Sequence, residues 1–316
     1  MQKTLFSEPN FEREIPFKVR NYGDFYYYPS PDLIPNLKEI ILFTENTKDK
    51  KIPNGSVWVY SVDDTKKINY NPEILKTDVG CGITGMIIPP LTFDNSTISD
   101  IFKAVNELNV DIGQGNHFLD FTTGYPKNRR ESNMVFLHSD FNKENYLPTT
   151  FEEAKNLEKT AENKRKEYLL NLAKKLQIKG KLYHNWTHNS VKIEKDELVY
   201  RKGSIDVSES EGIGILALNP VDGLYLYASD WADYRSSMQH GTGRIGSKSV
   251  MLDELVSSKE GIVRALMGTG KNVFEPKVRN ILNQTYNSEK LFQNKFRFEH
   301  KMIGCLIPEL IIYTKN

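Results

Sequence analysis

The stretch TFEEAKNLEKTAENKRKEYLLNLAKKLQ, residues 150–177, predicts the longest and clearest helix of the chain. Thr150 and Glu153 form a capping box at its start, and apolar residues recur along one face between charged ones. The basic run 164–166 predicts a solvated face, with contact to a phosphate backbone as the alternative. We therefore expect a long, exposed helical segment in the middle of the chain.

Strand-like segments surround this helix and are separated by Gly and Pro. They read LVYRKG (198–203), GIGILAL (212–218), GLYLYAS (223–229), MVFLHS (134–139) and MIGCLIPELIIYTKN (302–316). STISDIFKAVNELNV, residues 96–110, predicts an amphipathic helix with Ser99 as its N-cap. Because strands and helices do not alternate regularly, we expect an α+β fold rather than a doubly wound sheet. The length allows one large domain or two of ordinary size; the family resemblance described below implies a single domain over residues 1–316, with a mixed or antiparallel sheet and flanking helices.

The composition is that of a soluble globular protein. The chain has 316 residues, 39% hydrophobic and 26% charged, with a formal net charge of +1. No apolar stretch is long enough to span a bilayer, and MQKTLFSEPN lacks the apolar core of a signal peptide, so we expect a cytoplasmic protein without membrane contact. A charge near zero gives no global attraction to nucleic acid, so RNA contact would depend on local basic patches.

The residues that could carry chemistry lie in short polar motifs bounded by glycine. These motifs are DVGCG (78–82), GQGNHFLD (113–120), FLHSD (136–140), YHNWTHN (183–189) and HGTGR (240–244). Taken singly, each has an ordinary explanation, since a lone His at a strand end is commonly a packed side chain. We keep that explanation for His188 and His300, and we interpret Cys305 as a small apolar residue.

Taken together, five side chains form a mixed ligand set. Asp78 offers a carboxylate, Cys81 a thiolate, and His117, His138 and His184 offer imidazoles. Such a set suits Mn²⁺, Zn²⁺, Fe²⁺ or Co²⁺ better than Mg²⁺ or Ca²⁺. Five ligands exceed what one tetrahedral ion takes, but a thiolate can bridge two ions a few ångströms apart. Such a pair of ions is suited to clamping phosphoryl groups.

The order of the motifs resembles that of a known family. DVGCG, GNHF, HS, HN, RKG and HGTGR occur in the order in which the RtcB-type RNA ligases carry Asp-x-Gly-Cys-Gly, Gly-Asn-His-Phe, His-Ser, His-Asn, Arg-Lys-Gly and His-Gly-Ala-Gly-Arg. The resemblance covers residues from about 76 to 248. It implies an RtcB-like fold and a GTP- and Mn²⁺-dependent ligase that joins 2′,3′-cyclic phosphate or 3′-phosphate RNA ends to 5′-hydroxyl ends. An activating protein is a further expected partner.

The resemblance also implies the roles of the ligand set. Asp78, Cys81 and His117 would hold one Mn²⁺, and Cys81, His138 and His184 the other, with Cys81 as the bridging thiolate.

The resemblance assigns nucleotide chemistry to a further set of residues. His240 would attack the α-phosphate of GTP and become guanylylated, before the RNA end receives GMP as a 3′-to-5′ pyrophosphate. The residues implied in nucleotide or RNA contact are Asn116, Asp120, Asn185, Lys202, Gly241, Gly243, Arg244 and Lys315.

Two segments depart from the family pattern. The HSGSRG segment of the family reads HSDFNKEN here, which places Asp140 in a segment where a cation is expected. The Pro-Gly-Ser-Met-Gly loop is replaced by NPVDGLYLY, residues 219–227. These changes fit a specialised branch serving RNA repair rather than tRNA splicing. The alternatives are a two-metal phosphoesterase or nuclease, and a protein that binds RNA ends without ligating them.

Overall fold

The computed structural model describes most of the chain between Pro16 and Thr314. The described residues are 16–22, 27–43, 51–62, 68–112, 117–124, 133–142, 145–220, 222–228, 231–243, 258–260, 263–267 and 301–314. Within them, helices and largely antiparallel sheets are combined without regular alternation, as the α+β prediction requires.

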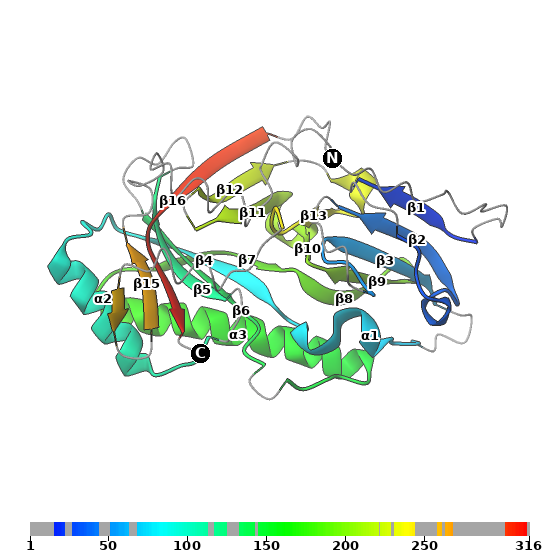
Figure 1. The fold of residues 1–316 in the computed structure, drawn as a ribbon, viewed down its shortest axis with the longest axis horizontal. Coiled ribbons are helices and arrows are strands. Elements are labelled where there is room, and N and C mark those ends of the chain that lie inside the picture. Colours follow the sequence, from blue (N-terminus) through cyan, green and yellow to red (C-terminus); the bar gives the residue numbers. More distant parts are fainter. Residues whose placement is uncertain are drawn as a thin grey trace, which may run out of the picture.

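The strands form one large and one smaller sheet (Figure 1). The five-stranded sheet has the order β1 (Lys18–Asn21), β2 (Leu37–Leu42), β3 (Ser56–Ser61), β9 (Glu197–Lys202) and β8 (Asn189–Glu194). The nine-stranded sheet runs β11 (Ile213–Asn219), β12 (Gly223–Ala228), β16 (Lys301–Thr314), β5 (Phe118–Thr123), β6 (Asn133–Ser139), β4 (Gly82–Ile88) and β7 (Lys181–Thr187). Strands β14 (Ser258–Glu260) and β15 (Val263–Met267) join it through β16.

The remaining elements connect or cover these sheets. A two-stranded ladder pairs β10 (Ser204–Asp206) with β13 (Ser237–Gln239). The α-helices are α1 (Pro72–Leu75), α2 (Asn95–Leu108) and α3 (Phe151–Lys175). Short 3₁₀ helices are η1 (Pro31–Leu33), η2 (Lys76–Asp78), η3 (Val207–Ser210) and η4 (Ala232–Tyr234). In the described part of the chain, no helix has the length and apolar character needed to cross a bilayer.

The helix predicted over 150–177 is confirmed as α3, but the prediction that the segment is exposed is wrong, because one face of the helix is buried along its length. Thr150 caps it and forms the expected capping box with Glu153. The cap predicted for the earlier helix is wrong, because α2 begins one turn sooner. Asp94 is its N-cap and its carboxylate accepts a hydrogen bond from the Thr97 backbone at 2.8 Å, so Ser99 lies inside the helix.

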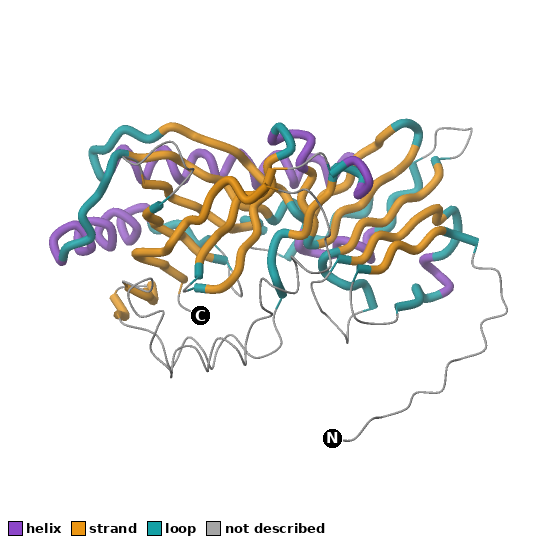
Figure 2. Tube along the Cα trace, turned by 90° about the horizontal axis from the view of Figure 1, so that it is seen from above, coloured by secondary structure: helices purple, strands orange, loops and turns teal. Residues whose placement is uncertain are grey.

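Helix α3 packs against both sheets, along the lower edge of the view in Figure 1. Its C-terminal half buries Leu169 and Leu172 in the core beneath the nine-stranded sheet. Its N-terminal half places Ala154 in the core of the five-stranded sheet. Figure 2 shows the same helix lying behind the strands along most of the molecule. The long helix is therefore the common support of the two sheets.

The nine-stranded sheet buries side chains on both faces. Leu119, Val135 and Leu137 point to the face that α2 and α3 cover. Ile83 and Phe136 point to the opposite face and pack with residues of β11 and β12. Because side chains alternate along a strand, His138 shares the second face with Phe136. This alternation decides where the functional side chains of β5, β6 and β7 point.

Candidate metal centre

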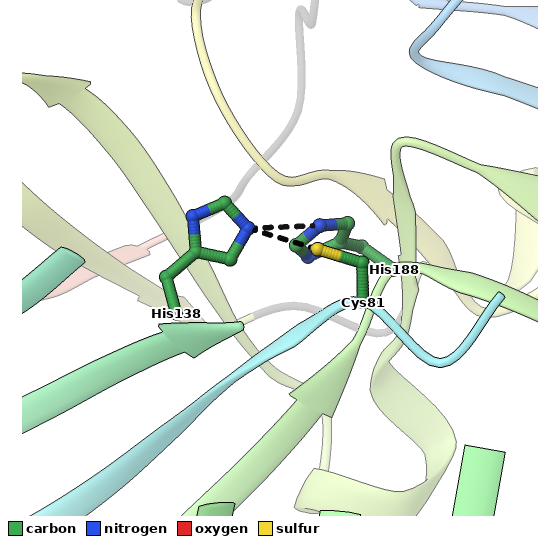
Figure 3. Close-up of side chains that lie close together, drawn as sticks. All are labelled: Cys81, His138 and His188. Carbon is green, nitrogen blue, oxygen red and sulfur yellow. Dashed lines mark hydrogen bonds between the residues drawn. The ribbon is translucent and has the colours of Figure 1, made fainter. Parts of the chain in front are cut away.

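Three side chains from separate parts of the chain bring their donor atoms together (Figure 3). Cys81 Sγ lies 3.2 Å from His138 Nε2, and His138 Nε2 lies 3.3 Å from His188 Nε2. All three side chains are buried, and their donor atoms lie within 4.8 Å of one another. This group, Cys81, His138 and His188, is the candidate metal centre.

Two of these ligands lie on segments joined by backbone hydrogen bonds. The N–H groups of His188 and Asn189 both donate to the carbonyl of Cys81, at 2.9 and 3.3 Å. The N–H of Gly80 in turn donates to the carbonyl of Asn189 at 2.9 Å. The turn before β4 and the turn between β7 and β8 are therefore held together next to the donor atoms.

The spacing of the donor atoms fits a bound ion. Two ligands on a tetrahedral ion, with bonds of about 2.0–2.3 Å, lie about 3.3–3.6 Å apart, and the observed separations are close to these values. Burial lowers the pKa of His188, with the neighbouring His240 and His138 rings adding to the effect. The neutral ring offers a lone pair to a metal. The residues present therefore fit a soft or borderline divalent cation.

The thiol at the centre needs such a cation to ionise. Burial raises the pKa of Cys81 well above its usual value, and the Asp140 carboxylate raises it further. A metal ion is the usual means by which a buried thiol becomes a thiolate. A cation bound here would therefore displace the thiol proton and convert Cys81 into a ligand.

His117 is a further imidazole in contact with the sulfur of Cys81. Its Nε2 is 3.3 Å from Cys81 Sγ and 4.0 Å from Asp140 Oδ2. The rings of His117 and His138 meet edge to face, with centroids 5.1 Å apart. Cys81 Sγ is thus within 3.3 Å of imidazole nitrogens of both His117 and His138.

His240 is stacked on the metal centre. Its ring lies 4.0 Å from that of His188 at an interplanar angle of 23°, and 6.3 Å from that of His138. Its Nδ1 lies 2.9 Å from the carbonyl oxygen of Gly203. A carbonyl only accepts, so Nδ1 carries a proton, and in the neutral ring the lone pair is therefore on Nε2. This nitrogen is therefore in the state that a nucleophile requires.

The structure places His188, and not the predicted ligand His184, in the candidate metal centre. His184 lies inside β7 and is half-buried, with its ring 4.2 Å from that of Tyr183 and 5.5 Å from that of Trp186. Its nitrogens are not in the donor group found among the described residues. The dipeptide His-Asn occurs twice, at 184–185 and 188–189, and the second occurrence lies at the centre.

The same shift corrects the predicted role of Asn185. Its Oδ1 accepts hydrogen bonds from Thr84 Oγ1 at 2.7 Å and from Arg165 Nη2 at 3.0 Å, on the face that α3 covers. It is therefore engaged away from the imidazoles and not available to GTP phosphates. Asn189, which the sequence analysis passed over, is buried and accepts the Gly203 N–H at 2.8 Å.

Arg165 corrects the interpretation of the basic run in α3. It is fully buried under the centre, and its Nη1 donates to the carbonyls of Gly80 at 2.6 Å and Ser139 at 2.7 Å. These residues are the chain neighbours of Cys81 and His138. Among the described residues, Arg165 forms no ion pair with a carboxylate. It is a buried support of the site and not a contact for a phosphate backbone.

The glycines of DVGCG make room for α3. Gly80 has φ +83°, and a Cβ there would lie 3.0 Å from the Cβ of Ala161. A Cβ at Gly82 would lie 2.8 Å from Arg165 Nη2. These glycines therefore permit the close packing of the helix and its arginine.

Asp78 and Lys202 are paired with each other. Lys202 Nζ lies 2.6 Å from Asp78 Oδ2 and also donates to the carbonyl of Leu75. Lys202 is buried, whereas the Asp78 side chain is 55% exposed. The lysine predicted to contact nucleotide or RNA is thus directed at the carboxylate predicted to be a metal ligand.

The predicted nucleotide contacts have mixed outcomes. Asp120 is buried on the same face of the sheet as His138, and burial raises the pKa of its carboxyl well above the usual range. Among the described side chains and backbone, its Oδ1 has no hydrogen-bond partner. Gly241 and Gly243 continue the chain from His240, and Gly243 has φ +83°. Asn116, Arg244 and Lys315 lie outside the described residues.

Comparison with known proteins does not identify a family: no protein-family model matches the chain, and no curated protein matches it.

Proposed function

We propose that this protein is a GTP- and Mn²⁺-dependent RNA ligase that joins 3′-phosphate or 2′,3′-cyclic phosphate ends to 5′-hydroxyl ends through a guanylylated His240. The observation that carries the proposal is the position of His240, stacked on a ligand of the candidate metal centre with its Nδ1 on the Gly203 carbonyl. A two-metal phosphoesterase has no need of a third imidazole held in this way. The RNA ligase resemblance of the motifs supports the same assignment.

The tautomer of His240 suits attack on phosphorus. Nε2 would form a P–N bond with the α-phosphate of GTP while the bond to the β-phosphate breaks and pyrophosphate leaves. The ring becomes an imidazolium, whose Nδ1–H already donates to the Gly203 oxygen at 2.9 Å. A hydrogen bond to a charged donor is stronger than one to a neutral donor, so this contact favours the product of the attack.

The guanylylated histidine then has two further transfers to support. An RNA 3′-phosphate oxygen attacks the phosphorus on His240 and releases the neutral imidazole. The 5′-hydroxyl attacks the RNA phosphate, and GMP leaves. Metal ions bound at the candidate centre would supply Lewis-acid stabilisation of the charge on the transferring phosphoryl groups. In this proposal, Cys81, His138 and His188 hold the first ion, and Cys81 and His117 contribute to the second.

Asp120 supports the nucleotide part of the proposal. A buried carboxyl oxygen without a partner is costly, since a lost hydrogen bond in a buried place costs about 1–3 kcal/mol. The N–H groups of a guanine would satisfy it. Asp120 lies two residues along β5 from Phe118, whose ring is 5.2 Å from that of His138, so the carboxyl is near the centre and on its face.

The test is transfer of label from GTP to protein. The purified protein is incubated with Mn²⁺ and GTP labelled at the α-phosphate, and label is sought on the protein that is acid-labile and alkali-stable, as a phosphoramidate is. The wild type is expected to become labelled and to ligate RNA with a 3′-phosphate to RNA with a 5′-hydroxyl. His240→Ala is expected to lose the label while it still binds Mn²⁺.

The matched variant for the metal is Cys81→Ala. It is expected to lose both Mn²⁺ binding and label, whereas His240→Ala loses only the label. An absence of label on wild-type protein that binds Mn²⁺ would overturn the ligase proposal. Hydrolysis of phosphoesters by that unlabelled protein would favour the phosphoesterase instead.

A further inference from the structure

Two adjoining hollows lie at the end of the five-stranded sheet where β3 ends and β9 begins. One has a volume of about 280 Å³ and the other of about 590 Å³, and Asn36 and Ser61 line both. Ser61 is the last residue of β3 and pairs with Glu197, the first residue of β9. Lys202, at the other end of β9, pairs with Asp78 of the DVGCG motif. The hollows and this motif therefore lie at opposite ends of β9, about 17 Å apart along the strand.

The smaller hollow, which we call the tyrosine hollow, has aromatic walls that are held in place. The rings of Tyr60 and Tyr70 each pack against that of Tyr200, with centroids 5.8 and 5.7 Å apart. The Tyr60 hydroxyl donates to the carbonyl of Leu33 at 3.0 Å. The Tyr200 hydroxyl accepts the Asn71 N–H at 2.6 Å. Tyr60 and Tyr200 are buried and Tyr70 is half-buried, so Tyr70 offers the aromatic surface that a ligand can contact.

The polar lining of the tyrosine hollow is close to neutral. Asp32 is the one charged residue in its described lining, and its carboxylate is 2.8 Å from the ammonium of Lys51. Asn36 and Asn69 are exposed, and each amide can both donate and accept hydrogen bonds. An aromatic wall with neighbouring amides suits an unpaired nucleobase, which stacks on a ring and forms hydrogen bonds at its edges.

The larger hollow, which we call the basic hollow, exposes cations and buries its carboxylates. The charged residues of its described lining are Lys18, Arg20, Lys38, Arg235, Glu39 and Glu197. The two lysine side chains are 63% and 50% exposed, whereas the two glutamate side chains are 4% and 14% exposed. Arg235 pairs with both carboxylates, at 3.0 and 2.6 Å. A ligand therefore meets a positive surface, which attracts the phosphates of a nucleic acid.

We propose that the two hollows together hold a single-stranded segment of RNA, with an unpaired base in the tyrosine hollow and the neighbouring phosphates over the basic hollow. Single strands are commonly bound by such a combination of a cationic groove and aromatic side chains. The inference rests on the proposed function for the choice of RNA, and it assigns a surface that holds the strand away from the reacting ends. A duplex keeps its bases paired and stacked, so it offers this surface only phosphates.

The test measures RNA binding where no ligation can occur. Full-length protein is titrated, without GTP, into fluorescein-labelled RNA that lacks a 3′-phosphate, and the fluorescence anisotropy gives the dissociation constant. The probes are a single-stranded RNA, an abasic RNA of the same length, the corresponding duplex and a polyglutamate peptide. The wild type is expected to bind the single-stranded RNA at least about tenfold more tightly than each of the other probes.

The basic hollow is tested with Lys18→Gln/Lys38→Gln. Both carboxylates keep Arg235 as a partner, so this variant is expected to fold. It should bind the single-stranded and the abasic RNA about tenfold more weakly at low salt, because phosphate contacts are lost. The matched control is Lys159→Gln/Lys174→Gln, which removes the same charge from exposed positions of α3 and should change the affinity less than about twofold.

The tyrosine hollow is tested with Asn69→Ala, at an exposed position, and with Tyr70→Leu, whose folding is checked by thermal unfolding. Both variants are expected to bind the single-stranded RNA at least about fivefold more weakly, because base contacts are lost. Binding of the abasic RNA should not change.

Equal losses in the lysine variant and its control would overturn this inference, as would variants of the tyrosine hollow that weaken abasic and base-bearing RNA equally. Tighter binding of polyglutamate than of RNA would also overturn it and would assign the surface to an acidic protein. Because these titrations contain no GTP, a protein with the expected RNA preferences that takes no label from GTP would overturn only the ligase proposal. A labelled protein without these preferences would overturn only this inference.

Discussion

Strands β6, β4 and β7 lie side by side at one end of the nine-stranded sheet. The buried polar groups on the two faces of this part of the sheet are satisfied in different ways. On one side, Cys81, His138 and His188 bring donor atoms together within 4.8 Å. On the other side, Arg165 gives its N–H groups to the carbonyls of Gly80 and Ser139 and to side chains of neighbouring strands. The donor atoms on the first side could hold a cation, and the polar groups on the second side are satisfied by the protein itself. Function and stability are therefore expected to depend on opposite faces.

The largest effect is expected on the helix side. Arg165→Met removes the donors to the Gly80 and Ser139 carbonyls and leaves buried acceptors unsatisfied. We expect the free energy of unfolding of the metal-free protein to fall by about 3–5 kcal/mol. Denaturant unfolding measures this loss. Lys166→Met is the control, because Lys166 pairs with Glu162 at the surface of the same helix and should cost under about 1 kcal/mol. Equal losses in the two variants would contradict the supporting role.

A second effect on the helix side depends on pH. Burial raises the pKa of Glu158 from 4.5 to about 7, against the opposing influence of Lys155. The folded state therefore binds this proton more tightly than the unfolded state, so stability is full below about pH 4.5 and is lost as pH rises towards 7. The shift corresponds to about 3 kcal/mol.

Glu158→Gln tests this pH effect, since the amide keeps an acceptor for the Val191 N–H. We expect the stability of the variant relative to wild type to increase by up to about 3 kcal/mol between pH 4.5 and pH 8. Denaturant unfolding of both metal-free proteins across this range measures the difference. A difference that does not change with pH would mean that Glu158 titrates as an exposed carboxylate does.

The sequence predicts a feature well when the residues that determine it lie close together in the chain, and poorly when they lie far apart. Helix α3 is decided locally, since Thr150, Glu153 and the apolar stripe lie within the helix itself. The convergence of Cys81, His117 and His138 with His240 agrees with the motif order. The residues around Asp78 do not predict its ion pair, because its partner Lys202 lies 124 residues further along the chain.

The two His-Asn dipeptides show the limit most clearly. The two dipeptides have the same sequence, and only the pairing of β7 with β4 gives them different positions in the fold. Trp186 lies opposite Ile83, so His184 is inside the ladder, whereas His188 follows its end. The burial of Arg165, which the basic run 164–166 does not predict, has a related reason. Its burial depends on the space left by Gly82, 83 residues earlier in the chain, and a charged run gives no sign of that.

On the metal side, the comparison is sharpest between His188→Ala and His184→Ala. We expect His188→Ala to weaken binding of the first ion by about 100-fold, because it removes a ligand whose nitrogen lies 3.3 Å from His138 Nε2. His184→Ala should change the affinity by less than about threefold. Mn²⁺ or Co²⁺ titration of folded protein measures both. A larger loss in His184→Ala would return the ligand role to the first dipeptide.

The smallest effect is expected at the far end of α3. Thr150→Ala removes the cap that accepts the Glu153 N–H at 3.1 Å and should lower the free energy of unfolding by about 1 kcal/mol. Metal affinity should stay within about twofold of wild type, since Thr150 caps the start of the helix, about four turns before Arg165. Thermal unfolding and metal titration report the two quantities. A marked loss of metal affinity would show that the two sides are coupled through the helix.

Main-chain hydrogen bonds connect the turn that contains Cys81 to the turn that contains His188. The backbone N–H groups of His188 and Asn189, which follow β7, both donate to the carbonyl of Cys81. Such a frame does not depend on which side chains it displays. A substitution of the Cys81 or His188 side chain is therefore expected to leave the main-chain hydrogen bonds between the two turns in place.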